Sequence, residues 1–505
     1  MPAFSILILL LLLFSNPTEK QAPKASQPNI LFLIADDWSF PHAGVYGDQV
    51  VLTPTFDRLA AEGALFTNAY TASPSCSPSR ASVLLGRYPH QNEAGGNLWS
   101  EFPAQYPTYV SLLEEDGYFT GSSRKGWGPG DFKVSGMENN PSGKTYEDFK
   151  SFLAERPKDQ PFTFWFGSTD PHREYVPNTG IQTGMQLEDV IVPGFFPDND
   201  CVRNDILDYY FEIERFDREC GQLIKMLQEA GELDNTIIVM TSDNGMPFPR
   251  AKANLYDYGT RMPLVIRWPD KIKAGTVIDD FVNFIDFAPS FVEAAGLEAE
   301  TMSGQSLWPL FAGEKQDRDQ VYLERERHAN VRKGDLSYPM RAVRDHKYLY
   351  IKNMMPERNP AGDPTVHQSV GQYGDVDNSI TKFLIMAMEG KSKSGSPDYF
   401  KLAFDKRPEE ELYDVVADPY QLNNLADDES LATVKENMRK KLQNWMEETG
   451  DLRAKDPRSL YWDEVRYTPD YQMKDFNLSQ GIEEYRIKPP FGKYAKEGIP
   501  CIQGN

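Results

Sequence analysis

The chain has 505 residues, of which 40% are hydrophobic and 25% are charged. Its length exceeds that of one ordinary domain, and its composition supports a large buried core, which excludes a wholly disordered chain. The net charge of −22 argues against nucleic acid as a partner, because a polyanion needs a basic surface. Four cysteines in a chain of this length do not form a disulfide framework.

The N-terminal residues are similar to an export signal. An unbroken apolar run covers Ile6 to Phe14, which fits the central region of a signal peptide but is too short to span a bilayer. No later stretch is long and apolar enough for a membrane span. We therefore expect residues 1–26 to be a signal peptide and linker. The scarcity of glycosylation sequons favours an exported bacterial protein, periplasmic or secreted, over a lysosomal one.

Strands and helices alternate along the first part of the chain. Apolar runs of strand length occur at residues 29–35, 118–122, 161–167, 236–241 and 264–268. Patterns typical of helices occur at residues 53–63, 109–116, 204–231 and 285–295. This alternation predicts an α/β domain with a mostly parallel sheet between helices. Ligand sites in such domains lie outside the carboxyl ends of the strands.

The pattern changes near residue 335, where short antiparallel strands replace the long buried ones. The expected strands and the amphipathic helix of this part lie at residues 340–343, 348–351, 411–414 and 431–449. We therefore expect two domains. The large α/β domain covers residues 27–335, and a smaller C-terminal domain with an antiparallel sheet and a helix covers residues 336–505.

Acidic side chains follow two of the expected buried strands. Asp36 and Asp37 come directly after the first strand, and Asp243 and Asn244 come after the run at 236–241. Because parallel strands end at the same edge of a sheet, we expect these four side chains to lie together. Three carboxylates and one amide suit Ca²⁺ or Mg²⁺, and without a cation the carboxylates would repel one another.

A cysteine lies at the start of an expected helix, in the segment Cys76-Ser-Pro-Ser-Arg80. The N-terminus of a helix attracts anions and lowers the pKa of a thiol, and Arg80 adds a positive charge one turn later. A buried structural cysteine has the same local pattern, and the spacing alone favours that alternative.

These elements together resemble the formylglycine-dependent sulfatases. Cys-x-Pro-Ser-Arg followed by Ala-Ser-x-Leu-Leu-Gly-Arg is similar to the family signature, and the two acidic segments are similar to its metal pairs. The resemblance implies an alkaline-phosphatase-like large domain and a formylglycine (3-oxoalanine) made from Cys76 by a maturation enzyme. It also implies one Ca²⁺ per site, with Mg²⁺ as the alternative, held by Asp36, Asp37, Asp243, Asn244 and residue 76.

The resemblance assigns catalytic roles to further residues. The hydrated formylglycine would attack sulfur with Arg80 beside it, which is covalent catalysis by an activated nucleophile. His172 would protonate the leaving amine or alcohol as the general acid. Lys252 is similar to the sulfate-binding base of the family.

One segment departs from the family pattern. Lys125 stands where sulfatases commonly carry Lys-x-His, but Gly126 and Trp127 follow it and the His is absent. The resemblance implies that Lys125 is a catalytic base of the site. A shift of one residue in the match would give that role to Arg124 instead.

A narrower resemblance is to the heparan N-sulfatases (sulfamidases, N-sulfoglucosamine sulfohydrolases). It rests on the segments Asp170–Arg173, Ser242–Pro249, Ser337–Arg341 and Glu411–Asp414. It implies removal of N-sulfate from glucosamine in heparan-derived or heparin-derived saccharides. Further candidates for substrate contacts are Arg173, His328 and Arg341. Surface ion pairs, or a solvated charged face around His328, are the alternatives.

Other functions stay open at this point. The same motifs are compatible with an O-sulfatase that acts on another sulfated carbohydrate. A phosphodiesterase or phosphonate hydrolase shares the fold, but the sequence shows no second set of metal ligands. A non-catalytic carbohydrate-binding protein is disfavoured by the intact Cys76, Pro78 and Arg80. The oligomeric state cannot be read from the sequence.

Overall fold

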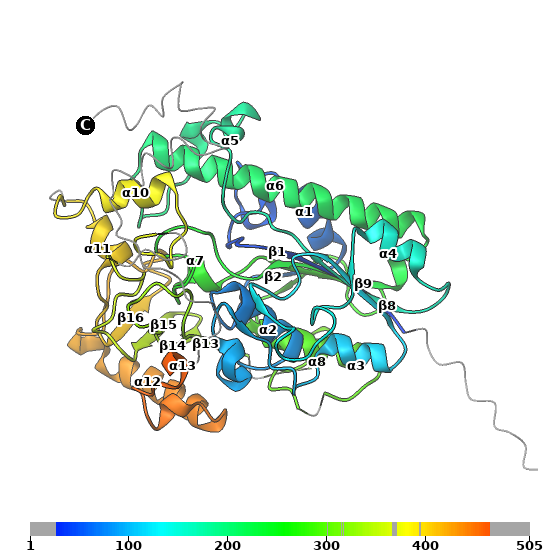
Figure 1. Ribbon diagram of the computed structural model, residues 1–505. Helices are drawn as coiled ribbons and strands as arrows, with labels where there is room; N and C mark the ends of the chain where they lie inside the picture. The colour runs from blue at the N-terminus through cyan, green and yellow to red at the C-terminus, as the bar shows by residue number, and fades with distance from the viewer. Residues whose placement is uncertain are drawn as a thin grey trace, which may run out of the picture.

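The computed structural model describes residues 27–299, 301–314, 316, 318–365, 371–392 and 395–464. Its main feature is an eight-stranded sheet with helices on both faces, beside a four-stranded antiparallel sheet (Figure 1). This confirms the expected α/β architecture and the expected second, antiparallel sheet. The signal peptide expected at residues 1–26 lies outside the described residues.

The strands of the large sheet come from the whole first part of the chain. In chain order they are β1 Asn29–Ala35, β2 Ala64–Phe66, β5 Phe119–Arg124, β7 Thr145–Tyr146, β8 Phe162–Gly167, β9 Thr236–Ser242, β10 Leu264–Arg267 and β11 Thr276–Ile278. Their order across the sheet is β11-β2-β10-β9-β1-β8-β5-β7. All neighbours are parallel except β10, which is antiparallel to both β2 and β9.

Two helical layers cover the large sheet (Figure 1). One layer contains α1 Pro54–Glu62, α4 Phe149–Glu155 and α6 Asp200–Glu229, and the other contains α2 Cys76–Leu85, α3 Tyr109–Glu115 and α8 Phe287–Ala294. Strand β1 needs both layers, because Leu31 and Leu33 pack in the core with α6, whereas Phe32 and Ile34 pack in the core with α2. Alternate side chains of an apolar strand point to opposite faces, so such a strand is stable only between two layers.

Shorter elements complete the large domain. Two small parallel pairs join β3 Ala69–Tyr70 with β12 Val282–Asn283 and β4 Ser100–Glu101 with β6 Gly130–Asp131. The short helices are α5 Thr179–Gln182, α7 Asp257–Thr260 and α9 Trp308–Phe311. None of the helices within the described ranges combines the length and the apolar character needed to cross a membrane.

The small sheet contains β13 Gln320–Arg325, β14 Met340–Asp345, β15 Tyr348–Asn353 and β16 Glu410–Asp414, in that order. The hairpin of β14 and β15 confirms the expected turn, and α12 Ala432–Glu448 packs on this sheet as the amphipathic pattern predicts. Strand β13 was not expected. It lies before residue 335, so the expected domain boundary falls inside the segment that forms the small sheet.

The connection between β15 and β16 returns to the large domain. It carries α10 Ile380–Met386 and α11 Tyr399–Phe404, and the last helix described is α13 Tyr461–Glu464. Ile385 of α10 and Phe404 of α11 belong to the same buried core as α6. Residues after the expected boundary therefore lie close to the carboxyl end of the large sheet.

Candidate active site

Strands β1 and β9 bring the two acidic segments together. They are parallel neighbours, paired in register to their last residues. The backbone N–H of Asp37 donates to Oδ1 of Asp243 at 3.1 Å, and the side-chain amide of Asn244 donates to Oδ1 of Asp37. Asp37 has a φ of 79°, a left-handed conformation that is unfavourable for a residue with a side chain and is concentrated at functional sites. The expected grouping of these residues with Asp36 is confirmed.

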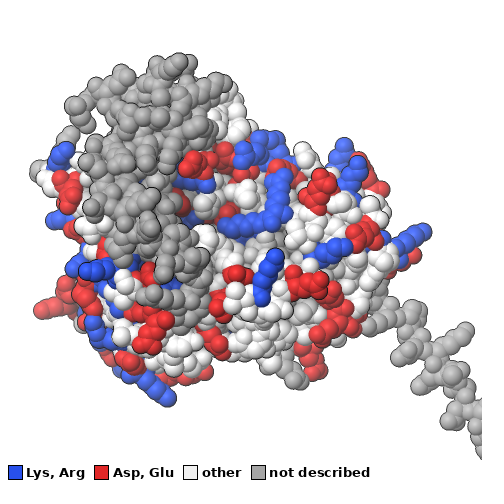
Figure 2. Space-filling view, viewed as in Figure 1, with Lys and Arg blue, Asp and Glu red and all other residues white. Residues whose placement is uncertain are grey.

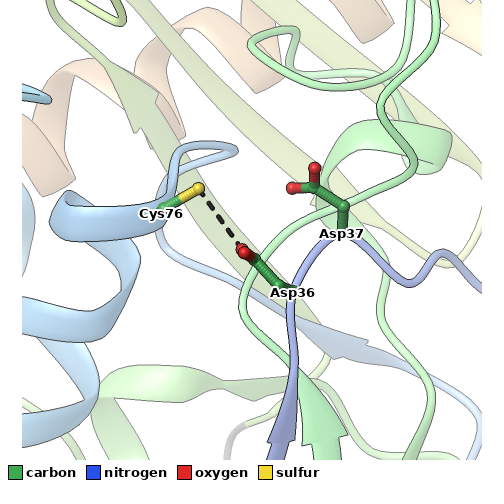
Figure 3. Close-up of side chains that lie close together, drawn as sticks. All are labelled: Asp36, Asp37 and Cys76. Carbon is green, nitrogen blue, oxygen red and sulfur yellow. Dashed lines mark hydrogen bonds between the residues drawn. The ribbon is translucent and has the colours of Figure 1, made fainter. Parts of the chain in front are cut away.

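Helix α2 points its first turn at this acidic group. Its N-terminal residue Cys76 donates from Sγ to Oδ1 of Asp36 at 3.5 Å (Figure 3). One turn later, Nε of Arg80 donates to Oδ2 of Asp243 at 2.7 Å, and Nη2 lies 3.7 Å from Oδ1 of Asp36. Arg80 is fully buried, and these contacts link α2 to the carboxyl ends of β1 and β9.

Two lysines bind the remaining carboxylate oxygens. Nζ of Lys125, directly after β5, donates to Oδ2 of Asp36 at 2.6 Å. Nζ of Lys252 donates to Oδ2 of Asp37 at 2.7 Å. Arg124 forms an ion pair with Glu219, and 43% of its side chain is exposed. The structure therefore brings Lys125, and not Arg124, to the site.

His172 completes the polar edge of the site. Its Nδ1 lies 2.7 Å from the carbonyl oxygen of Arg173, and its Nε2 lies 3.8 Å from Oδ2 of Asp37. Because a carbonyl only accepts hydrogen bonds, Nδ1 carries the proton and donates it. Nε2 therefore faces the site with 32% of the side chain exposed, which suits a group that exchanges a proton with a substrate.

The carboxylates differ in how they hold their charge. Burial would raise the pKa of Asp36, but Lys125, His172 and Arg80 hold it well below its ordinary value. Burial raises the pKa of Asp37 despite the opposing effect of Lys252. Burial also raises the pKa of Asp243 to about 6, although Arg80 lowers it. For Asp37 and Asp243, the effect of burial on the pKa therefore exceeds the opposing effect of the nearby cations.

The donor set fits a hard divalent cation. Ligand atoms of Asp36, Asp37 and Cys76 all lie within 4.8 Å of one another. Oδ1 of Asn244 is buried and has no hydrogen-bond partner among the residues that the structure describes. A buried amide oxygen without a partner is unfavourable, and a bound cation would satisfy it. Carboxylate and amide oxygens are the ligands that Ca²⁺ and Mg²⁺ prefer.

Burial makes the thiol of Cys76 a poor nucleophile as it stands. Desolvation raises the pKa of Cys76 well above its ordinary value, although Lys125 and Lys252 oppose the shift. The reactive form of cysteine is the thiolate, so an unmodified Cys76 would stay protonated and unreactive. This position therefore needs another chemical form if it is to attack a substrate.

His328 lies behind the first turn of α2. Its Nδ1 is 2.8 Å from Oγ of Ser75, the residue that precedes Cys76. Burial lowers the pKa of His328 to about 3, so the ring is neutral. The structure therefore brings His328 next to the site, where its closest described contact supports the nucleophile helix.

The expected substrate contact at Arg341 is wrong. The side chain is completely buried in the small sheet, where it binds Asp451 at 2.6 Å, Glu326 at 2.7 Å and Glu324 at 3.1 Å. The sequence around Arg341 gives no sign of these partners, because Asp451 is 110 residues away along the chain.

Arg173 also turns its charge away from the site. Its guanidinium donates to both carboxylate oxygens of Asp205, at 2.7 and 2.9 Å, and to the carbonyl of Pro247 at 3.0 Å. Its side chain is only 3% exposed. The expected substrate contact is therefore not made by the guanidinium, and Arg173 reaches the site through its backbone carbonyl at His172.

Trp127 occupies the place where the family pattern has a histidine. Its indole N–H donates to the carbonyl of Ser77 in the first turn of α2 at 3.1 Å, and the ring packs on Phe102. The departure from Lys-x-His thus replaces a polar group with an aromatic side chain that supports the nucleophile helix.

Asp377 is a further residue of the site, which no sequence pattern indicates. It lies between β15 and α10, and its Oδ2 is 3.2 Å from Nζ of Lys252. Its carboxylate also lies within 4.8 Å of the ligand atoms of Asp37 and His172. Burial would raise the pKa of Asp377, but Lys252 and His172 hold it below its ordinary value. The segment around it has no periodicity or motif that could have identified it.

The fold and the site define an α/β protein with a buried cluster of charged groups at the carboxyl ends of a mostly parallel sheet, where ligands bind in such domains. The profile described as "Sulfatase" matches residues 28–297, and the profile described as "N-sulphoglucosamine sulphohydrolase, C-terminal" matches residues 250–358. The chain therefore belongs to the sulfatase family, and it is a sulfatase.

Curated relatives cover most of the chain. Human N-sulphoglucosamine sulphohydrolase is 30% identical over 496 residues, which cover 85% of this chain and 91% of the relative. An ulvan-active sulfatase of Formosa agariphila is 29% identical over 490 residues, covering 86% of this chain and 77% of the relative. An N-acetylglucosamine-6-O-sulfatase of Bacteroides thetaiotaomicron is 26% identical and covers 62% of this chain and 76% of the relative.

Solved structures share the fold. A protein in complex with its substrate D-glucosamine-2-N,6-O-disulfate superposes with a TM-score of 0.61 at 21% identity, covering 87% of this chain and all of the other. The phosphonate monoester hydrolase of Agrobacterium radiobacter superposes with a TM-score of 0.60 at 17% identity, covering 84% and 96%. These likenesses concern the fold alone, and they confirm the expected alkaline-phosphatase-like architecture.

Proposed function

We propose that the protein removes N-sulfate from glucosamine at the ends of heparan-derived or heparin-derived saccharides. The observation that carries this proposal is the position of Cys76. It lies within Cys-x-Pro-x-Arg, at the first turn of α2, and its Sγ donates to Asp36 of the acidic group. The support for glucosamine comes from the human relative and from the N-sulphoglucosamine sulphohydrolase profile at residues 250–358.

The chain's own residues divide the reaction between them. In this proposal Lys125 and Lys252, which donate to Asp36 and Asp37, also bind sulfate oxygens, and Arg80 adds a buried positive charge beside Cys76. His172 presents Nε2 to the leaving atom and, when protonated, delivers a proton to it. The protein as a whole is acidic, and acidic side chains are spread over the visible face (Figure 2). Attraction of a sulfated ligand is therefore local to the site.

Two groups complete this site in our proposal. The residues that would hold a Ca²⁺, or alternatively a Mg²⁺, are Asp36, Asp37, Asp243, Asn244 and residue 76. A divalent cation supplies Lewis-acid stabilisation of charge on the sulfate group. A formylglycine in place of Cys76 supplies the nucleophilic oxygen that the buried thiol does not. Both groups follow from the sulfatase membership and the donor set.

An O-sulfatase is the second candidate. The ulvan-active sulfatase matches this chain about as well as the human N-sulfatase does, at 29% against 30% identity, and the N-acetylglucosamine-6-O-sulfatase is 26% identical over 62% of the chain. The catalytic groups named above would serve an ester as well as a sulfamate. The two functions differ only in the atom that leaves sulfur and in the contacts around it. A phosphonate hydrolase has only the shared fold in its favour.

One substrate separates the candidates. Matured protein is incubated with glucosamine that carries both an N-sulfate and a 6-O-sulfate, and NMR identifies which sulfate leaves. We expect loss of the N-sulfate, and no loss with the Cys76→Ala variant. Loss of the 6-O-sulfate alone would overturn the N-sulfatase proposal and leave the sulfatase chemistry intact. Loss of neither from formylglycine-containing protein would overturn glucosamine as the substrate.

We also propose that a formylglycine-generating enzyme matures the protein and that the protein is exported. The first proposal rests on the intact Cys-x-Pro-x-Arg segment at Cys76, and the second on the apolar run from Ile6 to Phe14. Cell fractionation of the native host tests export. An intact N-terminus on protein confined to the cytoplasm would contradict it.

A further inference from the structure

An acidic side chain lies where an anionic substrate must bind. Asp377 shares Lys252 with Asp37, and 16% of its side chain is exposed to solvent. Its carboxylate lies within 4.8 Å of the nearest ring nitrogen of His172. A negative charge at this position repels a sulfated ligand unless it contacts a donor on that ligand.

Contacts on both sides hold Asp377 in place. On one side, Asp375 forms buried ion pairs with Arg325 and Arg332. On the other side, Nζ of Lys382, which is fully buried, donates to the carbonyl of Val376 at 2.7 Å. These contacts on neighbouring residues fix the loop, and they therefore fix the position of the Asp377 carboxylate.

Further contacts fix the position of Asp377 relative to His172. Thr381, in the first turn of α10, donates to Oδ2 of Asp205 at 2.6 Å. Asp205 on α6 binds the guanidinium of Arg173, whose backbone carbonyl accepts the hydrogen bond from His172. A single carboxylate on α6 thus connects the loop of the general acid with the helix that follows Asp377.

A leaving amine gains more from this negative charge than a leaving alcohol does. When an S–O bond breaks, the product is a neutral alcohol. When an S–N bond breaks, the electron pair stays on nitrogen, sulfur is transferred to the attacking oxygen, and nitrogen takes a proton from His172. The resulting amine becomes an ammonium with several N–H donors at neutral pH, and a nearby carboxylate stabilises it.

We propose that Asp377 recognises the departing amine: its carboxylate accepts a hydrogen bond from the amino nitrogen of glucosamine as the S–N bond breaks. This inference rests on the proposed N-sulfatase function and names the residue that favours nitrogen over oxygen as the leaving atom. Asp377 takes no proton in this role. Its contact with Lys252 leaves it the capacity to accept further hydrogen bonds, since a carboxylate accepts about four.

The test compares the two products as inhibitors. Wild-type protein, Asp377→Asn and Asp377→Glu are assayed with glucosamine N-sulfate, and inhibition by free glucosamine and by inorganic sulfate is measured for each. We expect Asp377→Asn to lower kcat/KM about 10- to 100-fold, the usual effect of losing a charged hydrogen bond. We expect it to weaken inhibition by glucosamine at least about tenfold more than inhibition by sulfate, and Asp377→Glu to recover part of both.

Two controls make the result decisive. Glu389→Gln removes the same charge from an exposed position just after α10, and a matching loss there would overturn the proposal. An equal or larger effect of Asp377→Asn on sulfate inhibition would also overturn it, because Asp377 would then only position Lys252. Failure of the wild-type protein to release N-sulfate would instead refute the proposed function, and this is visible without any variant.

Discussion

The protein contains two buried clusters of charge that use the same residue types for different ends. At the carboxyl end of the large sheet, Asn244 keeps an unpartnered oxygen, and burial raises the pKa of Asp37 and Asp243. At the small sheet, Arg341 and Arg453 form ion pairs with three carboxylates, those of Glu324, Glu326 and Asp451. Burial alone therefore does not mark a functional site.

What separates the two clusters is whether the protein itself satisfies every buried polar atom. In the second cluster His90 also contributes, with Nδ1 at 3.0 Å from Oε1 of Glu324. The residues of this cluster leave no buried polar atom without a partner, as far as the structure describes the chain. The first cluster leaves such an atom beside two carboxylates whose pKa burial raises, which is typical of a ligand-binding site.

The largest expected effect concerns the nucleophile. Cys76→Ala should reduce turnover of the sulfated substrate on the order of 1,000-fold or more, because it removes the attacking group. The thermal midpoint should change little, since the substitution leaves the contacts of Arg80 in place. Steady-state assays and calorimetry check both. Turnover within tenfold of wild type would show that position 76 is not the nucleophile.

The second prediction tests the cation in the first cluster. Asp243→Asn should lower activity on the order of 100-fold at limiting Ca²⁺ and should recover part of it at high Ca²⁺, because one ligand charge is lost. Titration of chelated protein with Ca²⁺ measures this. Asp418→Asn, a turn carboxylate of the C-terminal part, is the control. Activity that changes neither with a chelator nor with added Ca²⁺ would contradict a metal site.

The third prediction tests the second cluster, which contains Arg341. Arg341→Met should destabilise the fold by about 3–5 kcal/mol, because it leaves Asp451 buried without its arginine and leaves Glu324 with His90 alone of its two cationic partners. The folded fraction should keep its KM, since Arg341 does not reach the site. Denaturant unfolding with parallel kinetics measures both. Arg439→Met, a partly exposed ion pair with Glu410, should cost much less. A raised KM without loss of stability would restore the substrate role.

The smallest effect concerns His328, which lies beside the first cluster. Burial lowers its pKa to about 3, so between that pH and the ordinary value only the unfolded chain takes up a proton, and stability falls as the pH drops. From pH 6.5 to pH 5 this costs about 2 kcal/mol. His328→Asn should therefore lose less stability than wild type over this range. His346→Asn, which changes an exposed ring, should behave like wild type.

Much of the first cluster could be predicted from the sequence, because its residues lie in short local segments at strand ends. Uninterrupted apolar runs identify β1 and β9, and the segments after them place Asp36 and Asp243. The signature around Cys76 identifies the nucleophile helix. Patterns of this kind depend on near neighbours in the chain, which a single sequence displays.

The second cluster could not be predicted, because its partners lie far apart in the chain. The charged run at Glu324-Arg-Glu-Arg-His328 is typical of a solvated surface. In the structure it is buried, and its first two residues are the last two of β13. Arg341 binds Glu324 and Glu326 of this run and also Asp451, and no local pattern connects these residues. Asp377 was missed for the same reason, since only the return of the chain from β15 brings it to the large sheet.

The first cluster is the catalytic site in this account. The most direct test of that claim is the chemical state of residue 76 in active protein. Mass spectrometry of the peptide that contains it, across preparations matured to different extents, is compared with the rate of N-sulfate release. We predict an aldehyde in place of the thiol and a rate proportional to the modified fraction. Full activity from protein whose Cys76 is entirely unmodified would contradict the account.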